Sequence, residues 1–407
     1  MKPEVHLLFL SNERFPAKLA CTIQQMFMCE AFAKAGAEVE MFYPLYYDIP
    51  RLSARAIQEY YGVVPNFAIK RLWSLLSLSK KLVDGKKRIA IPFIGGFSLL
   101  VSTTFMALNK LLSDRFNQPT VIYSRNVNGA YIFYTLKKTI AREKSIRIVF
   151  EVHSLDQQHP RRFFHRLLRD SDALVCISHA LKDALIAKYH VPQDRILVAA
   201  DGVKQSLLAS TPPAKEMARK QLDLPNTKIV LYTGQLLPGK GSEVFVSAAA
   251  SFSDDVLFLV VGGHGHYLER LKIKIVDENL TNVQVTGFVS PNRVPLYQVA
   301  ADVLVLPPTA DHDISAYTSP LKLFEYMAAR RPIVASDLPV LAEVLVHNKN
   351  ALLFQQGDSA DLADKIKELL QNDHLSKKLS EQAYADVQTL TWEHRAQDIL
   401  EFIRKGN

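Results

Sequence analysis

Two charged residues near the start of an expected helix have the types and the spacing to bind a nucleotide. Lys322 and Glu325 stand three positions apart, so they fall on one face of the first two helical turns. Ser319 is a suitable N-cap and Pro320 suits the first helical position, which predicts free backbone amides that attract phosphate. The ammonium would then meet a diphosphate and the carboxylate the hydroxyls of a ribose. The alternative is an ion pair on a solvated helix face.

A glycine-rich loop supplies a further cation. Lys240 lies in the segment 233–242, which follows an expected strand and enters a helix expected over Glu243–Ala250. That segment bends at two glycine turns, and a third glycine turn, 262–265, closes the next strand. Open α/β sheets bind ligands at the carboxyl ends of their strands. We therefore expect Lys240 to reach the same phosphates as Lys322 from the opposite loop.

Polar residues also follow apolar strands in the first half of the chain. Glu151 and His153 end one expected strand, and Arg125 ends the strand before it. Asn12 follows the first strand. A lone histidine is more often structural, but a Glu-x-His pair after an apolar strand favours a functional role. We expect Glu151, Arg125 and Asn12 to lie beside a ligand at this edge of the sheet.

The elements that would position these residues alternate along the whole chain. Continuous apolar runs, each followed by a helical pattern such as Cys21–Lys34, are typical of parallel strands covered on both faces. The expected strands are Val5–Leu10, Glu38–Tyr43, Val121–Arg125, Ile146–His153, Ala173–Ser178 and Ile196–Ala200, then Lys228–Thr233, Val256–Gly262, Asn282–Phe288, Val303–Pro307, Pro332–Ser336 and Ala351–Phe354. The pattern predicts an α/β fold of two doubly wound, parallel-sheet, Rossmann-like domains facing a central cleft. The domains are expected at 1–203 and 204–390.

Length and composition agree with this organisation. A chain of 407 residues suits two domains, and 48% hydrophobic with 22% charged residues gives no sign of disorder. The three cysteines form no even-numbered framework and lie in apolar segments, as in a reduced, cytoplasmic protein. We see no secretory signal at the start.

Positive charge is concentrated in the first half. Residues 1–200 carry 28 Lys and Arg against 16 Asp and Glu, whereas the remainder carries 21 against 25. No nucleic-acid motif is visible, so we expect no nucleic-acid partner and favour an anionic membrane surface. The uncharged stretch 89–109 is a core helix, a helix lying in the membrane interface or, least in keeping with its Pro, Gly and Ser content, a membrane span. The segment 161–169 mixes cations with apolar anchors, and is either a second membrane contact or a solvated helix.

On these motifs the second half resembles the donor domain of retaining GT-B glycosyltransferases of the large group called family 4. The resemblance covers residues 173–345 and is weak over the first 120. It rests on the loop 233–242, the turn 262–265 and the helix that ends Glu-Tyr-Met-Ala before Pro-Ile-Val-Ala at 332–335. The terminal segment 391–407 resembles the final helix of this fold, which crosses back onto the first domain.

The resemblance implies transfer of a hexosyl residue from a nucleotide diphosphate-sugar to a glycan or lipid-linked acceptor. The expected transfer retains the anomeric configuration and needs no metal, and the sugar nucleotide is a substrate, so no cofactor is expected. We expect such a transferase to act in surface polysaccharide or glycolipid biosynthesis, in the cytoplasm or at the inner face of the membrane. The implied catalytic residues are His153, Lys240, Lys322 and Glu325, with His153 in contact with a sugar hydroxyl or the departing phosphate. The implied acceptor-side residues are Glu151, Arg125 and Asn12. The implied donor-binding residues are Gly234, Gln235, Lys240, Gly262, Gly263, Phe288, Val289, Tyr317, Ser319, Pro320, Leu321, Lys322 and Glu325.

Two positions depart from the family pattern and keep alternatives open. Gln235 stands where the family has an arginine, and Tyr317 where it often has a glutamate eight positions before the ribose-binding one. The acidic run 311–313 is a substitute carboxylate, a metal ligand or, in our preferred interpretation, a flexible loop. The alternative functions are a nucleotide-sugar epimerase or hydrolase on the same fold and a non-catalytic binding subunit.

Overall fold

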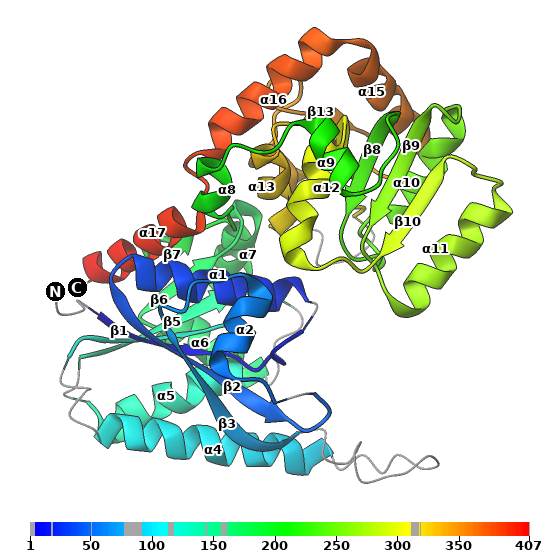
Figure 1. The fold of residues 1–407 in the computed structure, drawn as a ribbon. Coiled ribbons are helices and arrows are strands. Elements are labelled where there is room, and N and C mark those ends of the chain that lie inside the picture. Colours follow the sequence, from blue (N-terminus) through cyan, green and yellow to red (C-terminus); the bar gives the residue numbers. More distant parts are fainter. Residues whose placement is uncertain are drawn as a thin grey trace. The chain divides into compact units, whose positions relative to one another are not determined.

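The computed structural model describes residues 5–17, 19–49, 51–76, 92–112, 118–142, 145–155, 161–310, 317 and 319–406. The chain divides into two compact units, each built around one parallel sheet (Figure 1). The first unit comprises residues 1–177, 181–199 and 392–407, and the second comprises 178–180 and 200–391. This confirms the α/β class with two parallel sheets. The chain passes between units at residues 199 and 200, just before the expected boundary.

The first sheet has the order β3-β2-β1-β4-β5-β6-β7, with all pairs parallel. Its strands are β1 (Val5–Leu10), β2 (Ala37–Tyr46), β3 (Ala68–Leu76), β4 (Thr120–Ser124), β5 (Ile146–Val152), β6 (Ala173–Cys176) and β7 (Ile196–Val198). Six of the seven were predicted within a few residues. Strand β3 was not predicted, because it is an edge strand in which exposed Lys70 and Arg71 interrupt the apolar pattern.

Helices cover both faces of this sheet. They are α1 (Ala20–Lys34), α2 (Ala54–Tyr61), α4 (Pro92–Leu112), α5 (Val127–Ile140), α6 (Arg161–Asp170), α7 (His179–Tyr189) and α17 (Trp392–Lys405). The terminal helix α17 packs against α1, so the end of the chain completes the first unit. Helix α4 packs against β3 and α5, and α5 packs against α6 (Figure 1). Among the helices in the described ranges, none combines the length and the hydropathy that crossing a bilayer requires.

The second sheet has the order β10-β9-β8-β11-β12-β13. Its strands, all predicted within about two residues, are β8 (Lys228–Thr233), β9 (Val256–Val261), β10 (Val283–Gly287), β11 (Val303–Leu306), β12 (Ile333–Ser336) and β13 (Leu352–Phe354). Its helices are α8 (Gln205–Ala209), α9 (Lys215–Gln221), α10 (Ser242–Ala248), α11 (Gly265–Asp277), α12 (Val294–Ala300), α13 (Leu321–Ala328), α14 (Pro339–Ala342), α15 (Ser359–Gln371) and α16 (Asp373–Val387).

Alternate residues of the central strand β8 face opposite layers, as the period of two requires. Ile229 and Leu231 join a core cluster with Phe324 of α13, whereas Val230 and Tyr232 join a second cluster with Phe245 of α10. Both sheet faces are therefore buried. This explains why the strands read as continuous apolar runs in the sequence.

Each sheet has one point where the strand order reverses. In the second sheet it lies between β8 and β11, and in the first between β1 and β4. Loops that leave the carboxyl ends of such strand pairs diverge to opposite faces, and ligands of open α/β sheets bind there. We therefore expect ligand-binding residues at these two edges.

Candidate functional site

The loop after β8 and the segment after β11 meet at the reversal point of the second sheet. The Thr309 amide donates a hydrogen bond to the Gly239 carbonyl at 3.1 Å. Gly241 has φ +75°, and a Cβ atom there would lie 1.5 Å from the Pro307 carbonyl oxygen. Only glycine permits this approach of the two backbones. The loop that carries Lys240 is therefore held against the end of β11.

Lys322 extends from α13 onto the same loop. Its Nζ lies 4.0 Å from the ring centroid of Tyr232, a cation-π contact. The same Nζ is 3.6 Å from the position that a Cβ atom would occupy on Gly234, whose φ is +136°. The Tyr232 hydroxyl donates to the Gln235 carbonyl at 2.7 Å, which fixes the loop beside the ammonium.

Burial disfavours the charged form of both lysines, and the charge of Lys240 adds to this effect at Lys322. Burial lowers the pKa of Lys240. Burial, together with the nearby charge of Lys240, lowers the pKa of Lys322 to about 7, although Glu325 acts in the opposite direction. Two desolvated ammonium groups this close are stabilised by an incoming dianion. The arrangement fits a diphosphate.

Glu325 lies one helical turn from Lys322 and is held by a side chain that the sequence analysis missed. Gln298 of α12 donates from Nε2 to Glu325 Oε2 at 3.2 Å. Burial raises the pKa of Glu325. The next residue, Tyr326, accepts a hydrogen bond from the Thr233 amide at 2.8 Å, which ties α13 to the end of β8. Helix α13 is thereby fixed against the strand that leads into the Lys240 loop.

The start of α13 corrects the predicted roles of both Ser319 and Pro320. The helix begins at Leu321 with Pro320 as its N-cap residue, and no side chain caps it. Ser319 is not the N-cap, because its hydroxyl accepts from the Asp201 amide at 3.0 Å. Pro320 has no N–H to offer, so the first amides of the helix belong to Leu321 and Lys322.

The other predicted donor residues follow the strands of the same sheet. The Gly262 amide donates to the Gly287 carbonyl at 2.9 Å, and Gly263 follows it. Phe288 and Val289 come directly after β10, where Phe288 is exposed and Val289 packs against the core. Tyr317 is half-buried, and its carbonyl accepts from the Ser178 hydroxyl at 3.2 Å.

The acidic run 311–313 lies outside the described residues. Within the described part, no group of three or more His, Cys, Asp or Glu side chains is arranged to hold a metal ion.

In the first unit, Glu151 is the centre of a buried network. Its Oε1 accepts from Gln24 Nε2 at 2.9 Å, Arg395 Nη2 at 2.8 Å and His153 Nε2 at 2.7 Å, and its Oε2 accepts from the Tyr123 hydroxyl at 2.6 Å. The Glu151 side chain is fully buried. The expectation that Glu151 contacts an acceptor is therefore wrong. It orients His153 instead.

His153 is held as a neutral imidazole. Burial and the charge of Arg125 lower its pKa to about 4, while Glu151 acts in the opposite direction. The pKa of Glu151 lies well below its usual range, because Arg395 and His153 offset its burial. The ionised carboxylate accepts a hydrogen bond from the Nε2–H of His153, so Nδ1 carries the lone pair. At neutral pH this imidazole accepts a hydrogen bond and is too weak a base to remove a proton.

Arg125 and Asn12 lie at the reversal point of the first sheet, after β4 and β1. Arg125 donates to Gln24 Oε1 at 2.6 Å, which joins it to the Glu151 network. Asn12 is exposed, and its carbonyl accepts from the Tyr46 hydroxyl at 3.0 Å. Neither Gln24 nor Arg395 could be predicted from the sequence, because each stands in an ordinary helical pattern far along the chain from Glu151.

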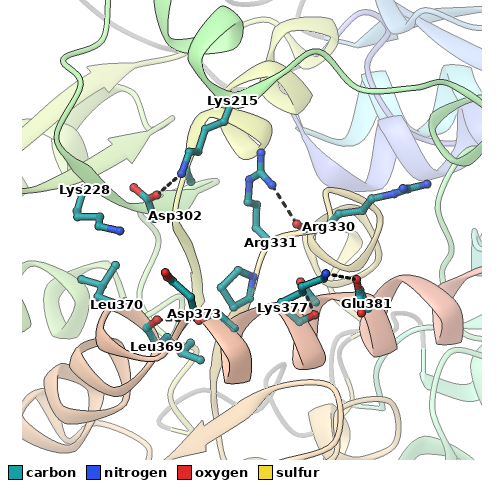
Figure 2. A pocket seen from close by; sticks show the side chains of 14 residues that line it. Lys215, Lys228, Asp302, Arg330, Arg331, Leu369, Leu370, Asp373, Lys377 and Glu381 are labelled. Carbon is teal, nitrogen blue, oxygen red and sulfur yellow. Dashed lines mark hydrogen bonds and ion pairs between the residues drawn. The ribbon is translucent and has the colours of Figure 1, made fainter.

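A separate hollow of about 450 Å³ lies at the opposite edge of the second sheet, where its strands begin (Figure 2). Lys228, Asp302 and Arg331 line it. Lys215 pairs with Asp302 at 2.7 Å, and Arg331 donates to the Val299 carbonyl at 2.8 Å. It contains none of the predicted site residues. Several of its cations are already engaged, so it is not our candidate.

Two family models of glycosyltransferases match consecutive parts of the chain. Residues 214–386 match the family model described as Glycosyl transferases group 1, and residues 26–206 match the model Glycosyltransferase Family 4. The chain is 24% identical to an uncharacterized glycosyltransferase of Methanocaldococcus jannaschii over 57% of this chain and 59% of the relative. It is 25% identical to an alpha-D-kanosaminyltransferase of Streptomyces kanamyceticus over 63% of this chain and 69% of the relative.

A solved structure extends the likeness to the whole fold. The crystal structure of Anabaena HepE in complex with UDP and glucose matches with a TM-score of 0.72 and 18% identity. The match covers 98% of this chain and 99% of that chain.

Proposed function

The chain belongs to the glycosyltransferases, of the group 1 and family 4 type with the GT-B fold, and on that premise we propose what it transfers. It moves a hexosyl residue from a nucleotide diphosphate-sugar, with UDP as the first nucleotide to test, to a glycan or glycolipid acceptor. The observation that carries the proposal is the pair of Lys240 and Lys322 beside one glycine loop, with both pKa values lowered. A relative in fold binds UDP and glucose, which supports the choice of nucleotide.

The proposed chemistry follows from charge. Cleavage of the bond between the anomeric carbon and the diphosphate oxygen leaves negative charge on the departing phosphate. Positioned cations stabilise that charge most strongly where water is partly excluded. Lys240, Lys322 and the first amides of α13 provide this stabilisation, so we propose that the reaction needs no metal.

We further propose that the reaction retains the anomeric configuration. The acceptor would attack from the side of the leaving group, and the departing diphosphate would take its proton. Glu325 would bind the ribose hydroxyls. His153 would accept a hydrogen bond from a sugar hydroxyl through Nδ1, because its Nε2 is bound to Glu151.

The cellular setting belongs to the proposal as well. The excess of positive charge in residues 1–200 supports a site of action at the inner face of an anionic membrane. Surface polysaccharide or glycolipid biosynthesis needs a transferase there. The acceptor would then be lipid-linked.

The test is an assay of purified protein against a panel of nucleotide diphosphate-sugars, with and without acceptor extracts and with a metal chelator present. Acceptor-dependent consumption of one donor, unaffected by the chelator, is the expected result. Donor turnover in the absence of any acceptor would favour an epimerase or hydrolase. Nucleotide binding without consumption of any donor would favour a binding subunit.

A further inference from the structure

Helix α4 exposes a row of large apolar side chains to solvent. Phe97 and Phe105 are each 66% exposed, and Val101 between them is exposed as well. Positions four apart lie on one face of a helix, so the three side chains form a single stripe. Leu100 and Leu112 extend it. A surface helix ordinarily turns polar residues outward, so this stripe requires an apolar partner.

The opposite face of α4 packs against the rest of the first unit. Thr103, Ala107 and Leu111 are buried, and the Ser98 hydroxyl accepts from the Leu75 amide of β3 at 2.8 Å. The helix is therefore firmly docked through one side. The exposed apolar stripe is therefore not the core-facing side of the helix rotated into solvent.

The helices beside α4 are basic. Helix α4 packs on α5 and α5 on α6 (Figure 1), so the outer surfaces of these neighbours face the same way. Exposed cations lie on α5 and α6, with acidic residues at the end of α6 and just after it. The cations are Lys138, Arg161, Arg162, Arg166 and Arg169.

The local charge is strongly positive even after the acidic residues are counted. Asp170 neutralises part of this group, because it pairs with Arg169 at 2.8 Å and with Lys138 and Arg166 at 3.7 Å each. Helices α4, α5 and α6 together, however, carry seven Lys and Arg against one Asp and no Glu. An apolar stripe beside excess positive charge matches the boundary between anionic headgroups and acyl chains. A second copy of the same basic surface would be repelled by it.

We propose that the outer face of α4, flanked by α5 and α6, is the surface through which this protein lies on an anionic lipid bilayer. The α4 stripe enters the headgroup boundary, and the cations of α5 and α6 contact the lipid phosphates. The inference deepens the proposed function, because it identifies the surface that meets the membrane holding a lipid-linked acceptor.

The test is co-sedimentation of the full chain with vesicles of phosphatidylcholine alone and of phosphatidylcholine mixed with phosphatidylglycerol. We expect binding to the anionic vesicles only, and release as salt screens the cations. The double variant Phe97→Ser/Phe105→Ser should bind at least tenfold more weakly. The matched control is Ile273→Ser/Val276→Ser on α11 of the second unit, where the two side chains are 61% and 72% exposed; it should bind like the unaltered chain.

Two further measurements separate the outcomes. Thermal midpoints show whether the double variant is folded, and calorimetry with UDP reports on the donor site, which should be unchanged in both variants. Equal vesicle binding by the unaltered chain and the folded α4 double variant overturns the docking surface. So does lipid-free self-association that the α4 double variant abolishes while vesicle binding persists, because the stripe then covers a second copy. Absence of UDP binding by the unaltered chain would instead count against the proposed function alone.

Discussion

Arg395, on the helix that ends the chain, donates a hydrogen bond at 2.8 Å to the buried carboxylate of Glu151 on strand β5. The same guanidinium donates to the Ala199 carbonyl at 3.1 Å, so one side chain joins α17 to two other parts of the first unit. His153 depends on this pair, because Glu151 fixes the tautomer of its imidazole. Helix α17 therefore acts on His153 indirectly, through the Glu151 carboxylate.

Replacing Arg395 should destabilise the protein strongly. Arg395→Met leaves the Glu151 carboxylate buried without its cation, and breaking a buried pair in this way costs about 3–5 kcal/mol. Arg55→Met is the control, since it removes the exposed pair between Arg55 and Glu59, which should contribute under about 1 kcal/mol. Urea unfolding of both variants measures the difference. Equal losses in the two would show that the buried pair has no special role.

Protonation of His153 should contribute to the pH dependence of the free energy of unfolding. Its pKa is about 4 in the folded protein against an ordinary value of 6.5, so the unfolded chain binds the extra proton first. The free energy of unfolding should therefore fall as pH drops from about 6.5 towards 4, with a slope of up to about 1.4 kcal/mol per pH unit from this group. In His153→Gln the slope over that window should be smaller. An unchanged slope in urea titrations would mean that His153 is not held neutral.

Removal of Lys240 or Glu325 should impair donor turnover without unfolding the protein. Lys240→Ala and Glu325→Ala each take away one positioned contact, and such losses lower rates about 100-fold or more. The control is Lys228→Met, which lies in the hollow at the opposite edge of the sheet and should leave turnover unaltered. Initial rates with a saturating acceptor make the comparison. Unaltered rates in both site variants would remove the proposed site.

Nucleotide binding should draw a proton onto Lys322. The pKa of this lysine is about 7 in the free protein, and a diphosphate beside it would raise the value. At pH 8 to 9, where UDP itself is ionised, binding should take up close to one proton, and affinity should fall about tenfold per pH unit. Calorimetry in two buffers of different ionisation enthalpy measures the uptake. Its absence, or its persistence in Lys322→Met, would place the nucleotide elsewhere.

The sequence predicted most strands because both faces of each sheet are covered, which leaves long apolar runs. Strand β3 was not predicted, because its position at the sheet edge allows exposed charged residues such as Lys70 and Arg71, which interrupt the apolar run. The positions of Lys240, Lys322 and Glu325 along one sheet edge followed from glycine turns and from the helix spacing. The role of Glu151 did not, because its main partner, Arg395, is 244 residues away. Likewise, nothing in the spacing linked Gln298 to Glu325.

The most direct measurement of the central claim is a crystal structure of the protein with UDP bound. The account predicts diphosphate oxygens within hydrogen-bond distance of Nζ of both Lys240 and Lys322, with the Glu325 carboxylate on the ribose hydroxyls. A nucleotide bound among Lys228, Arg330 and Lys377 at the other edge of the sheet, or one whose phosphates meet neither Lys240 nor Lys322, would contradict it.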